Sequence, residues 1–238
     1  MLYTEEAVKA NIRNREGKRV FYLAKEDTLT PGARDWLRGE HIEIVAAEKA
    51  KAKQYKLLGG GFTDEKSEQM THLNAEVLVL KTHPRIKFRG AMDTLEAEMI
   101  LAMIEADKRV SDRLSELLAL ARRIIRCDVL EEELLIEKLC GLTENEIRTR
   151  SHRPQDFYGV PHFMPEYTDG VLIARLNRVR CAVREAELYA VDAFSDRDGR
   201  LVRSDIIRAL NRMSSMVYIL MIEIKSGDEK WKSQPWRN

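Results

Sequence analysis

The chain lacks the cysteine content of a disulfide-bonded or metal-clustered protein. Its 238 residues contain three cysteines, Cys127, Cys140 and Cys181, and no two of them have the CxxC spacing of a zinc or redox motif. Each cysteine sits singly within a helical pattern, so we interpret all three as reduced, structural thiols. This cysteine usage is typical of a cytoplasmic protein.

Long hydrophobic runs and a surplus of charge are also missing. The longest apolar stretch, residues 213–224, is shorter than the roughly 20 residues that span a bilayer, and it contains Glu223. The N-terminal residues have no apolar run of the kind found in signal peptides. The chain carries 40 lysines and arginines against 39 aspartates and glutamates, a formal charge of +1. The composition therefore favours no nucleic-acid partner and no membrane partner, and any anion site must be local.

The first 55 residues predict a small α/β lobe. Residues 19–24 and 41–46 have the composition and alternation of strands. Residues 30–38 open with Thr30 and Pro31, a helix N-cap followed by proline. The order of these elements predicts a β-α-β lobe over residues 1–55, to which we assign no chemistry.

Residues 56–75 are polar and include three glycines at positions 59–61. Such glycines let the backbone approach a phosphate closely, but the GxxxxGK[ST] signature of a phosphate-binding loop is absent. We therefore interpret residues 56–75 as a flexible linker. Residues 76–238 then form the main domain.

The main domain has apolar residues at the four-three spacing of amphipathic helices. The pattern predicts helices over residues 86–107, 110–127, 129–140, 169–194 and 201–224. A short capped helix ending near Arg150 is counted as an extension of the third. The fold class that we predict is mainly α: a five-helix bundle with the small N-terminal β-α-β lobe.

The helix predicted over residues 169–194 carries a row of charged side chains beside its buried seam. Arg180, Arg184 and Glu187 are separated by four and three residues, so they share one helical face. The helix predicted over residues 201–224 sets Asn211 and Arg212 beside its own seam. Two interpretations stay open: the arginines bind an anion, or they flank the seam with Glu187 as their intrahelical partner.

Residues 151–168 are unusually rich in proline, histidine and aromatic residues for a connecting segment. Prolines stiffen the backbone and aromatic rings offer flat apolar surface, as a loop that closes over a large hydrophobic ligand requires. The alternative is a loop that packs its own side chains against the bundle. The composition does not separate these two interpretations.

Three separate motifs, in the same order, resemble those of the ATP:cob(I)alamin adenosyltransferases. They are KTHPRIKFRGAMDTL at residues 81–95, VRCAVREAE at residues 179–187 and ALNRMSS at residues 209–215. The likeness is greatest to the ethanolamine-utilisation (EutT-like) branch and weaker to the propanediol-utilisation and mitochondrial (PduO-like) enzymes. The resemblance implies that the 5′-deoxyadenosyl group of ATP is transferred to the cobalt of reduced cobalamin, with release of triphosphate, in support of ethanolamine utilisation.

The resemblance also implies roles for individual residues. It pairs Asp93 with Arg180 of a neighbouring subunit and puts Arg184 on the ATP phosphates, which makes these three the catalytic candidates. The implied ATP-binding residues are Thr71, Lys81, Arg89, Arg180, Arg184, Glu187 and Asn211. The implied cobalamin-binding residues are Phe157, Tyr158, His162 and Phe163.

The chain departs from its branch in one respect that concerns metals. Many ethanolamine-branch enzymes have a histidine followed by a cysteine cluster upstream of the bundle, a soft-ligand site for a divalent metal. No cysteine precedes Cys127 here. We therefore expect no transition-metal site, and we expect Mg²⁺ to accompany the triphosphate of ATP.

The resemblance further implies a homo-oligomer, a trimer or a dimer, whose active site lies at the subunit interface. It implies a cytoplasmic enzyme, with association with a bacterial microcompartment as a further option. An alternative from another class is a non-catalytic helical-bundle protein that binds or delivers a corrinoid. Such a protein would keep the aromatic loop but would turn over no ATP.

Overall fold

The computed structural model describes residues 1–15, 18–47, 55–63 and 65–227, and the chain divides into two compact units, Met1–Ser67 and Glu68–Asn238. The boundary between them falls within residues 56–75, the segment that we expected to connect two domains. Residues 228–238, which end the predicted main domain, lie outside the described residues. No helix in the described ranges is long and apolar enough to cross a bilayer.

The N-terminal unit contains the predicted β-α-β arrangement. Strand β3 (Lys18–Ala24) pairs in parallel with β5 (Glu43–Ala47), and helix α2 (Pro31–Gly39) connects them. Thr30 caps α2 by accepting a hydrogen bond from the Ala33 N–H group at 3.3 Å. The pattern missed four short elements: β1 (Leu2–Tyr3), α1 (Glu5–Ala10), β2 (Arg13–Arg15) and β4 (Thr28–Leu29). The unit has its own small core, which includes Val8, Phe21, Ala33 and Leu37.

Residues 56–75 contain strands where we expected only a flexible connection. Strands β6 (Tyr55–Leu57) and β7 (Phe62–Thr63) pair in an antiparallel hairpin, and β8 (Met70–His72) and β9 (Val77–Leu80) form another. Gly60 and Gly61 have φ values of 96° and 81°, in the left-handed region that favours glycine. These glycines therefore serve the turn of the first hairpin.

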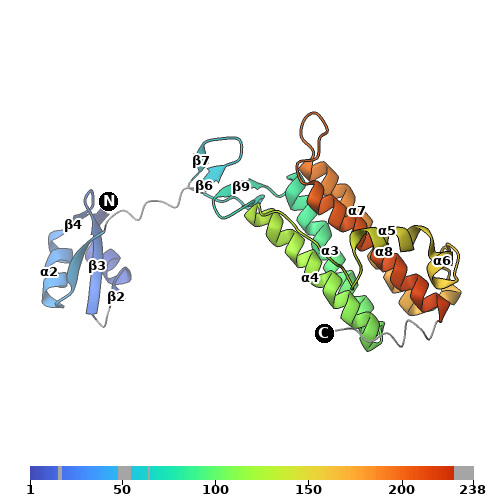
Figure 1. Cartoon of the computed structure of the whole chain (residues 1–238). Coiled ribbons are helices and arrows are strands. Elements are labelled where there is room, and N and C mark those ends of the chain that lie inside the picture. The colour runs from blue at the N-terminus through green and yellow to red at the C-terminus, as the bar shows by residue number, and fades with distance from the viewer. Residues whose placement is uncertain (16–17, 48–54, 64, 228–238) are drawn as a thin grey trace. The chain divides into compact units, whose positions relative to one another are not determined.

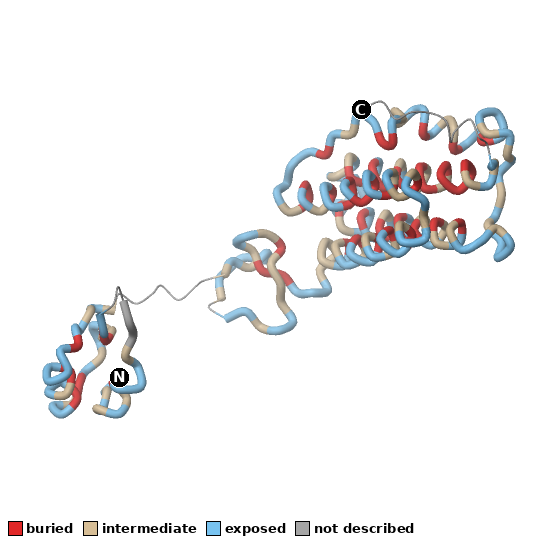
Figure 2. Tube along the Cα trace, turned by 90° about the horizontal axis from the view of Figure 1, so that it is seen from below, coloured by how far each residue is buried: buried red, intermediate tan, exposed pale blue. Residues whose placement is uncertain are grey.

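The second unit is built on four long helices that lie side by side in Figure 1. They are α3 (Pro84–Glu105), α4 (Lys108–Leu130), α7 (Val171–Phe194) and α8 (Ser204–Ser226). Helix α7 packs against both α3 and α8, and the short helices α5 (Glu144–His152) and α6 (Pro154–Tyr158) pack against α8. The buried residues line the facing sides of the long helices (Figure 2). The mainly helical class is thus confirmed.

The prediction of a helix over residues 129–140 is wrong. Helix α4 ends where Glu131 adopts a left-handed conformation, with φ of 58°, and donates its backbone N–H to the Cys127 carbonyl. Glutamates at 131–133 then lie at the negative end of the helix dipole, which disfavours further helix. Leu134 and Leu139 are buried as separate anchors of a non-helical strap. In the described residues of this unit, four long helices are accompanied by the short α5 and α6, so the five-helix bundle stays a prediction.

A buried carboxylate ties the start of the bundle together. Asp128 on α4 has no exposed surface, and its two oxygens accept hydrogen bonds from Arg85 Nε at 2.8 Å and Arg89 Nε at 2.7 Å. Arg89 also donates to the Leu73 carbonyl, at 2.8 Å, in the turn between β8 and β9. One carboxylate therefore links α3, α4 and the hairpin that precedes α3.

We predict that Asp128→Ala destabilises the helical unit by about 3 kcal/mol or more, because two largely buried guanidinium groups lose their buried counter-ion and Arg85 keeps only a 3.7 Å pair with the exposed Glu131. The free energy of unfolding from urea denaturation, followed by helical circular dichroism, measures the change. Asp112→Ala is the matched control, since Asp112 pairs with Lys108 on the exposed face of the same helix. Equal destabilisation by the two substitutions would contradict the structural role of Asp128.

Candidate functional site

A cavity of about 1040 Å³ lies in the helical unit. Its walls come from α7, α8 and the segment that leads from α5 towards α7. The lining residues are Ser151, His152, His162, Phe163, Met164, Pro165, Arg180, Arg184, Glu187, Leu188, Val191, Asn211, Ser214, Ser215 and Tyr218. Six of the residues proposed from the sequence are thus brought together here: Arg180, Arg184, Glu187, Asn211, His162 and Phe163.

The α7 wall of the cavity carries two arginines without a carboxylate partner. Arg180 is half-buried, with its guanidinium 5.3 Å from the centre of the Tyr218 ring. Arg184 is exposed, and within the described residues neither arginine makes an ion pair. Glu187 instead accepts a hydrogen bond from Asn211 on α8, at 3.2 Å. These contacts do not support Glu187 as the intrahelical partner of the arginines, and they favour the interpretation that the arginines face an anion.

Another part of the cavity lining is an aromatic wall, formed by His162 and Phe163 around Tyr218 on α8. The Tyr218 hydroxyl lies 3.2 Å from His162 Nδ1 and accepts a hydrogen bond from the Phe163 N–H group, also at 3.2 Å. Its ring stacks on those of His162 and Phe163, with centroids 5.9 and 6.0 Å apart. The Lys225 amino nitrogen lies 4.4 Å from the centre of the Phe163 ring. The loop thus presents flat apolar surface beside two cations.

Sequence reasoning missed Tyr218, although a signal was present. Asn211, Ser214, Ser215 and Tyr218 follow the spacing of three, four and seven that defines one face of a helix, and all four line the cavity. Because Tyr218 directly follows the buried seam residue Val217, its position reads as the edge of the core. Its hydroxyl is what distinguishes it as a site residue.

The structure does not bring Phe157 and Tyr158 to this cavity. Phe157 is 47% exposed on α6, with the Arg150 guanidinium 5.6 Å over its ring. Tyr158 packs against the core of the bundle, and burial raises the pKa of its hydroxyl. The segment 151–168 therefore combines both interpretations offered for it: one part packs on the bundle and the other lines a cavity.

Three predicted ATP-binding residues and the catalytic candidate Asp93 do not line the cavity. Thr71 pairs with Val79 in the β8–β9 hairpin, and Lys81 is exposed just after it. Arg89 is held by the Asp128 carboxylate, as described above. Asp93 is exposed on α3, and within the described residues no ion pair involves it.

Two different faces of α7 line two hollows. Arg180, Arg184, Glu187, Leu188 and Val191 line the large cavity on the α8 side. A smaller hollow of about 390 Å³ between α3 and α7 is lined by Gly90, Thr94, Arg178, Glu185 and Tyr189, with Lys87 and Ala91. Beside this smaller hollow, Arg178 on α7 forms an ion pair with Glu98 on α3, with 3.0 Å between Nε and Oε1. Asp93 lines neither hollow, so the structure of one chain does not bring it to the arginines of the cavity.

The donor set of the cavity is not that of a transition-metal site. Among the residues that the structure describes, no group of three or more His, Cys, Asp or Glu side chains is placed to hold a metal ion. Burial, helped by the charge of Glu116, raises the pKa of the Cys140 thiol to about 12, which disfavours the thiolate form that binds metals. The expectation that the chain has no transition-metal site stays a prediction.

Comparison with known proteins agrees with these features. A family model described as cobalamin adenosyltransferase matches residues 62–224. The corrinoid adenosyltransferase EutT of Escherichia coli (strain K12) is 31% identical over 242 residues, which cover 92% of this chain and 90% of that protein. The corrinoid adenosyltransferase EutT of Salmonella typhimurium (strain LT2) has the same identity and coverage. No solved structure matches the chain. The chain therefore belongs to the cobalamin adenosyltransferase family.

Proposed function

We propose that this corrinoid adenosyltransferase carries out its reaction in the cavity between α7, α8 and the 161–165 loop. The 5′-deoxyadenosyl group of ATP is transferred to the cobalt of reduced cobalamin, and triphosphate leaves. The observation that carries this proposal is the pairing of two guanidinium groups free of carboxylates with an aromatic wall, around one cavity of about 1040 Å³.

Arg180 and Arg184, which we call the arginine row, suit the departing triphosphate. When the cobalt attacks the ribose 5′ carbon, negative charge develops on the oxygen that leaves with the triphosphate, and no protein base is required. Guanidinium groups fixed where that charge develops lower the barrier. Arg184 is free to make bidentate contacts with phosphate oxygens, while Arg180 is held in place over Tyr218.

The aromatic wall suits the corrinoid. The cavity volume lies at the upper end of the range of roughly 300–1,000 Å³ that is usual for small-molecule sites, so it has room for a large ligand or for parts of two. Phe163 and His162 offer stacked rings against which a flat macrocycle can pack. Exclusion of water by such a wall strengthens every electrostatic contact inside the site.

Mg²⁺ fits the donor set as a companion of the triphosphate. The cavity offers one carboxylate, Glu187, and one side-chain amide, Asn211, and the two are hydrogen-bonded to each other. Mg²⁺ in nucleotide enzymes is commonly held by one or two carboxylates together with substrate phosphates. When bound, the ion would neutralise part of the charge of the triphosphate, and Glu187 is the residue that would hold it.

A second copy of the chain completes the proposed site. Asp93 lies on α3 and is not among the residues that line the cavity, so one chain does not bring it to Arg180 and Arg184. An Asp93 carboxylate from a neighbouring copy could pair with Arg180 and orient it. Lys81 and Thr71 belong to the same part of the chain as Asp93 and would approach the nucleotide from the same neighbour. The arrangement is a homo-oligomer, either a trimer or a dimer.

The names of the relatives also suggest a setting. EutT enzymes are corrinoid adenosyltransferases, and we propose that this chain likewise supplies adenosylcobalamin for ethanolamine utilisation in the cytoplasm. Association with a microcompartment would be a further property of that pathway. Loss of growth on ethanolamine after deletion of the gene, restored by added adenosylcobalamin, would support the assignment.

An assay with ATP and chemically reduced cobalamin tests the activity itself. We expect the absorption of the cobalt(I) form to disappear and a light-sensitive cobalt–carbon bond to form, together with triphosphate. A protein that only delivers corrinoid would bind cobalamin but form no such bond. That result would favour the alternative of a non-catalytic corrinoid-binding protein.

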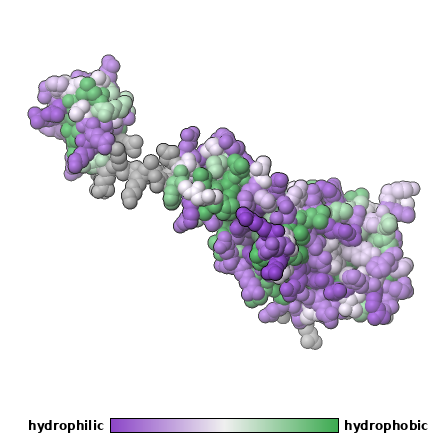
Figure 3. All heavy atoms as spheres, turned by 90° about the horizontal axis from the view of Figure 1, so that it is seen from above, coloured by the Kyte–Doolittle hydropathy of each residue, from purple (hydrophilic) through white to green (hydrophobic). Residues whose placement is uncertain are grey.

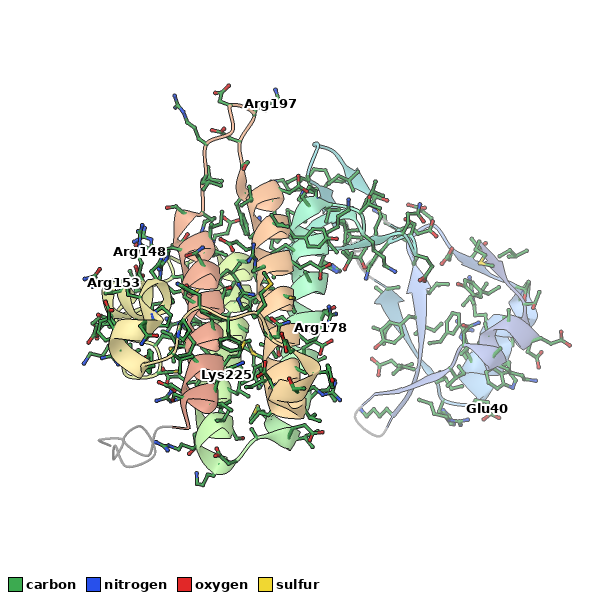
Figure 4. The ribbon with its side chains drawn as sticks, turned by 90° about the vertical axis from the view of Figure 1, so that its right-hand side faces the viewer. Glu40, Arg148, Arg153, Arg178, Arg197 and Lys225 are labelled. Carbon is green, nitrogen blue, oxygen red and sulfur yellow. The ribbon has the colours of Figure 1, made fainter. Side chains whose placement is uncertain are left out.

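We predict that Arg184→Ala lowers kcat/KM by about 10²–10³-fold, the usual effect of removing one donor that stabilises developing charge. The control is Arg197→Ala, because Arg197 is exposed at the tip of the loop that connects α7 and α8 (Figure 4). Arg197→Ala should leave turnover unchanged. Wild-type turnover of the Arg184 variant would remove Arg184 from the mechanism.

Mixing two inactive variants tests whether the site is shared between copies. Random exchange of Asp93→Ala and Arg184→Ala subunits should restore up to about one quarter of wild-type activity, because an intact Asp93 then meets an intact Arg184 at some sites. Mixing Arg180→Ala with Arg184→Ala is the matched control, and it should restore none, since both residues come from the same helix. Exchange without recovery in the first mixture, verified with differently tagged subunits, would contradict the shared site.

A further inference from the structure

Both ring nitrogens of His162 are engaged in hydrogen bonds, although the residue is exposed at the cavity wall. Nε2 lies 3.2 Å from the backbone carbonyl oxygen of His152, and Nδ1 lies 3.2 Å from the Tyr218 hydroxyl. A third hydrogen bond joins the same hydroxyl to the backbone N–H of Phe163. The imidazole is therefore held on two sides.

These partners determine which nitrogen carries the proton. A carbonyl oxygen can only accept, so Nε2 of His162 must be the protonated, donating nitrogen. Nδ1 of the neutral ring then has a lone pair. The Tyr218 hydroxyl has two acceptors in reach, Nδ1 at 3.2 Å and the Phe163 carbonyl oxygen at 3.5 Å, and the nearer Nδ1 accepts its proton. The hydroxyl oxygen still has a lone pair for the Phe163 N–H group, so all the groups in the network are satisfied.

An imidazole lone pair beside a corrinoid would oppose the proposed reaction. Neutral imidazole nitrogen is a common ligand of transition metals, cobalt among them. An axial donor changes the reduction potential of the metal that it binds. Entry of an electron into the axial orbital of cobalt is easier without such a donor, because the donor raises the energy of that orbital. An aromatic wall built to face cobalt must therefore keep its histidine nitrogens occupied.

We propose that Tyr218 is a positioning residue that withholds the His162 Nδ1 lone pair from the cobalt of the bound corrinoid. This inference rests on the proposed function, because it requires a corrinoid beside the 161–165 loop. Tyr218 itself is held by its place on α8, by its stacking with His162 and Phe163, and by the Arg180 guanidinium over its ring. One side chain thereby connects the aromatic wall to the arginine row.

Substitution of Tyr218 by phenylalanine tests the proposal, because it keeps the ring and removes only the hydroxyl. The probe is cob(II)inamide, a corrinoid without a lower nucleotide base, bound with ATP to the full-length protein under anaerobic conditions. Electron paramagnetic resonance then reports an axial nitrogen as a triplet splitting of the cobalt lines. We expect no nitrogen splitting in the wild type and a clear splitting in Tyr218→Phe. Turnover should fall about tenfold, the scale of one lost, well-aligned hydrogen bond.

The double variant Tyr218→Phe/His162→Phe identifies the donor. It should lose the nitrogen splitting, which separates His162 from the other cavity histidine, His152. Tyr22→Phe, which removes a hydroxyl from β3 in the N-terminal unit, is the matched control and should match the wild type. Splitting in the wild type, no splitting in Tyr218→Phe, or splitting that persists in the double variant would each overturn the proposal.

A measurement on the unliganded wild type guards against a variant that fails to fold. Nitrogen-15 NMR of the histidine rings should show His162 with a protonated Nε2 and an unprotonated, hydrogen-bonded Nδ1. The opposite tautomer would overturn the inference. Failure of the wild type to bind cobinamide or to form the cobalt–carbon bond would instead overturn the proposed function. A wild type that turns over normally but has a free His162 nitrogen would overturn only the inference about Tyr218.

Discussion

The packing of α7 between α3 and α8 is the constraint on which the rest of the helical unit depends. Its buried seam, which includes Leu176, Val179, Val183 and Ala186, is occupied by these two neighbours. Burial of each of the larger side chains contributes about 1.5–3 kcal/mol. Rotation of the helix about its own axis would expose them, so its orientation is fixed. A fixed rotation decides which polar residues face the cavity and which face α3. The arginine row is thus positioned by apolar contacts that touch no substrate.

Charge in this protein is divided between cations that are paired in the fold and cations that are left for ligands. Arg85 and Arg89 are bound to the buried Asp128, and Arg113 is bound to Glu223, whose pKa is raised by burial despite that pairing. The face of the helical unit seen in Figure 3 is largely hydrophilic, with scattered apolar areas. Arg184, by contrast, lines the cavity and makes no ion pair within the described residues, since the Glu187 carboxylate of the cavity accepts a hydrogen bond from Asn211 instead. The sequence alone does not distinguish the paired arginines from those that line the cavity, because only the fold reveals which cations have a buried partner.

The sequence predicted the four long helices to within a few residues because their apolar spacing matches the helical period. It also brought Arg180, Arg184, Glu187 and Asn211 to one site, since those residues lie beside the seams of two helices that pack together. It failed at residues 131–140, where buried leucines anchor a non-helical segment and the local pattern imitates a helix. The role of Tyr218 escaped notice for a related reason: a residue at the edge of a seam looks like core until its hydrogen bonds are known.

Asp93 marks a different limit, because its predicted partner is expected on another copy of the chain, and no reading of one fold can supply that contact.

The same reasoning applies to the electrostatics of the cavity. Salt at physiological strength screens exposed charges beyond about 8 Å, so the near-neutral total charge of the chain says little about the field at Arg184. The residues that line the cavity include two guanidinium groups and a single carboxylate, Glu187, already hydrogen-bonded to Asn211. The site is therefore short of negative charge until an anion enters. A polyphosphate supplies that charge, whereas a nucleoside without phosphates does not, and this imbalance favours ATP over its uncharged fragments.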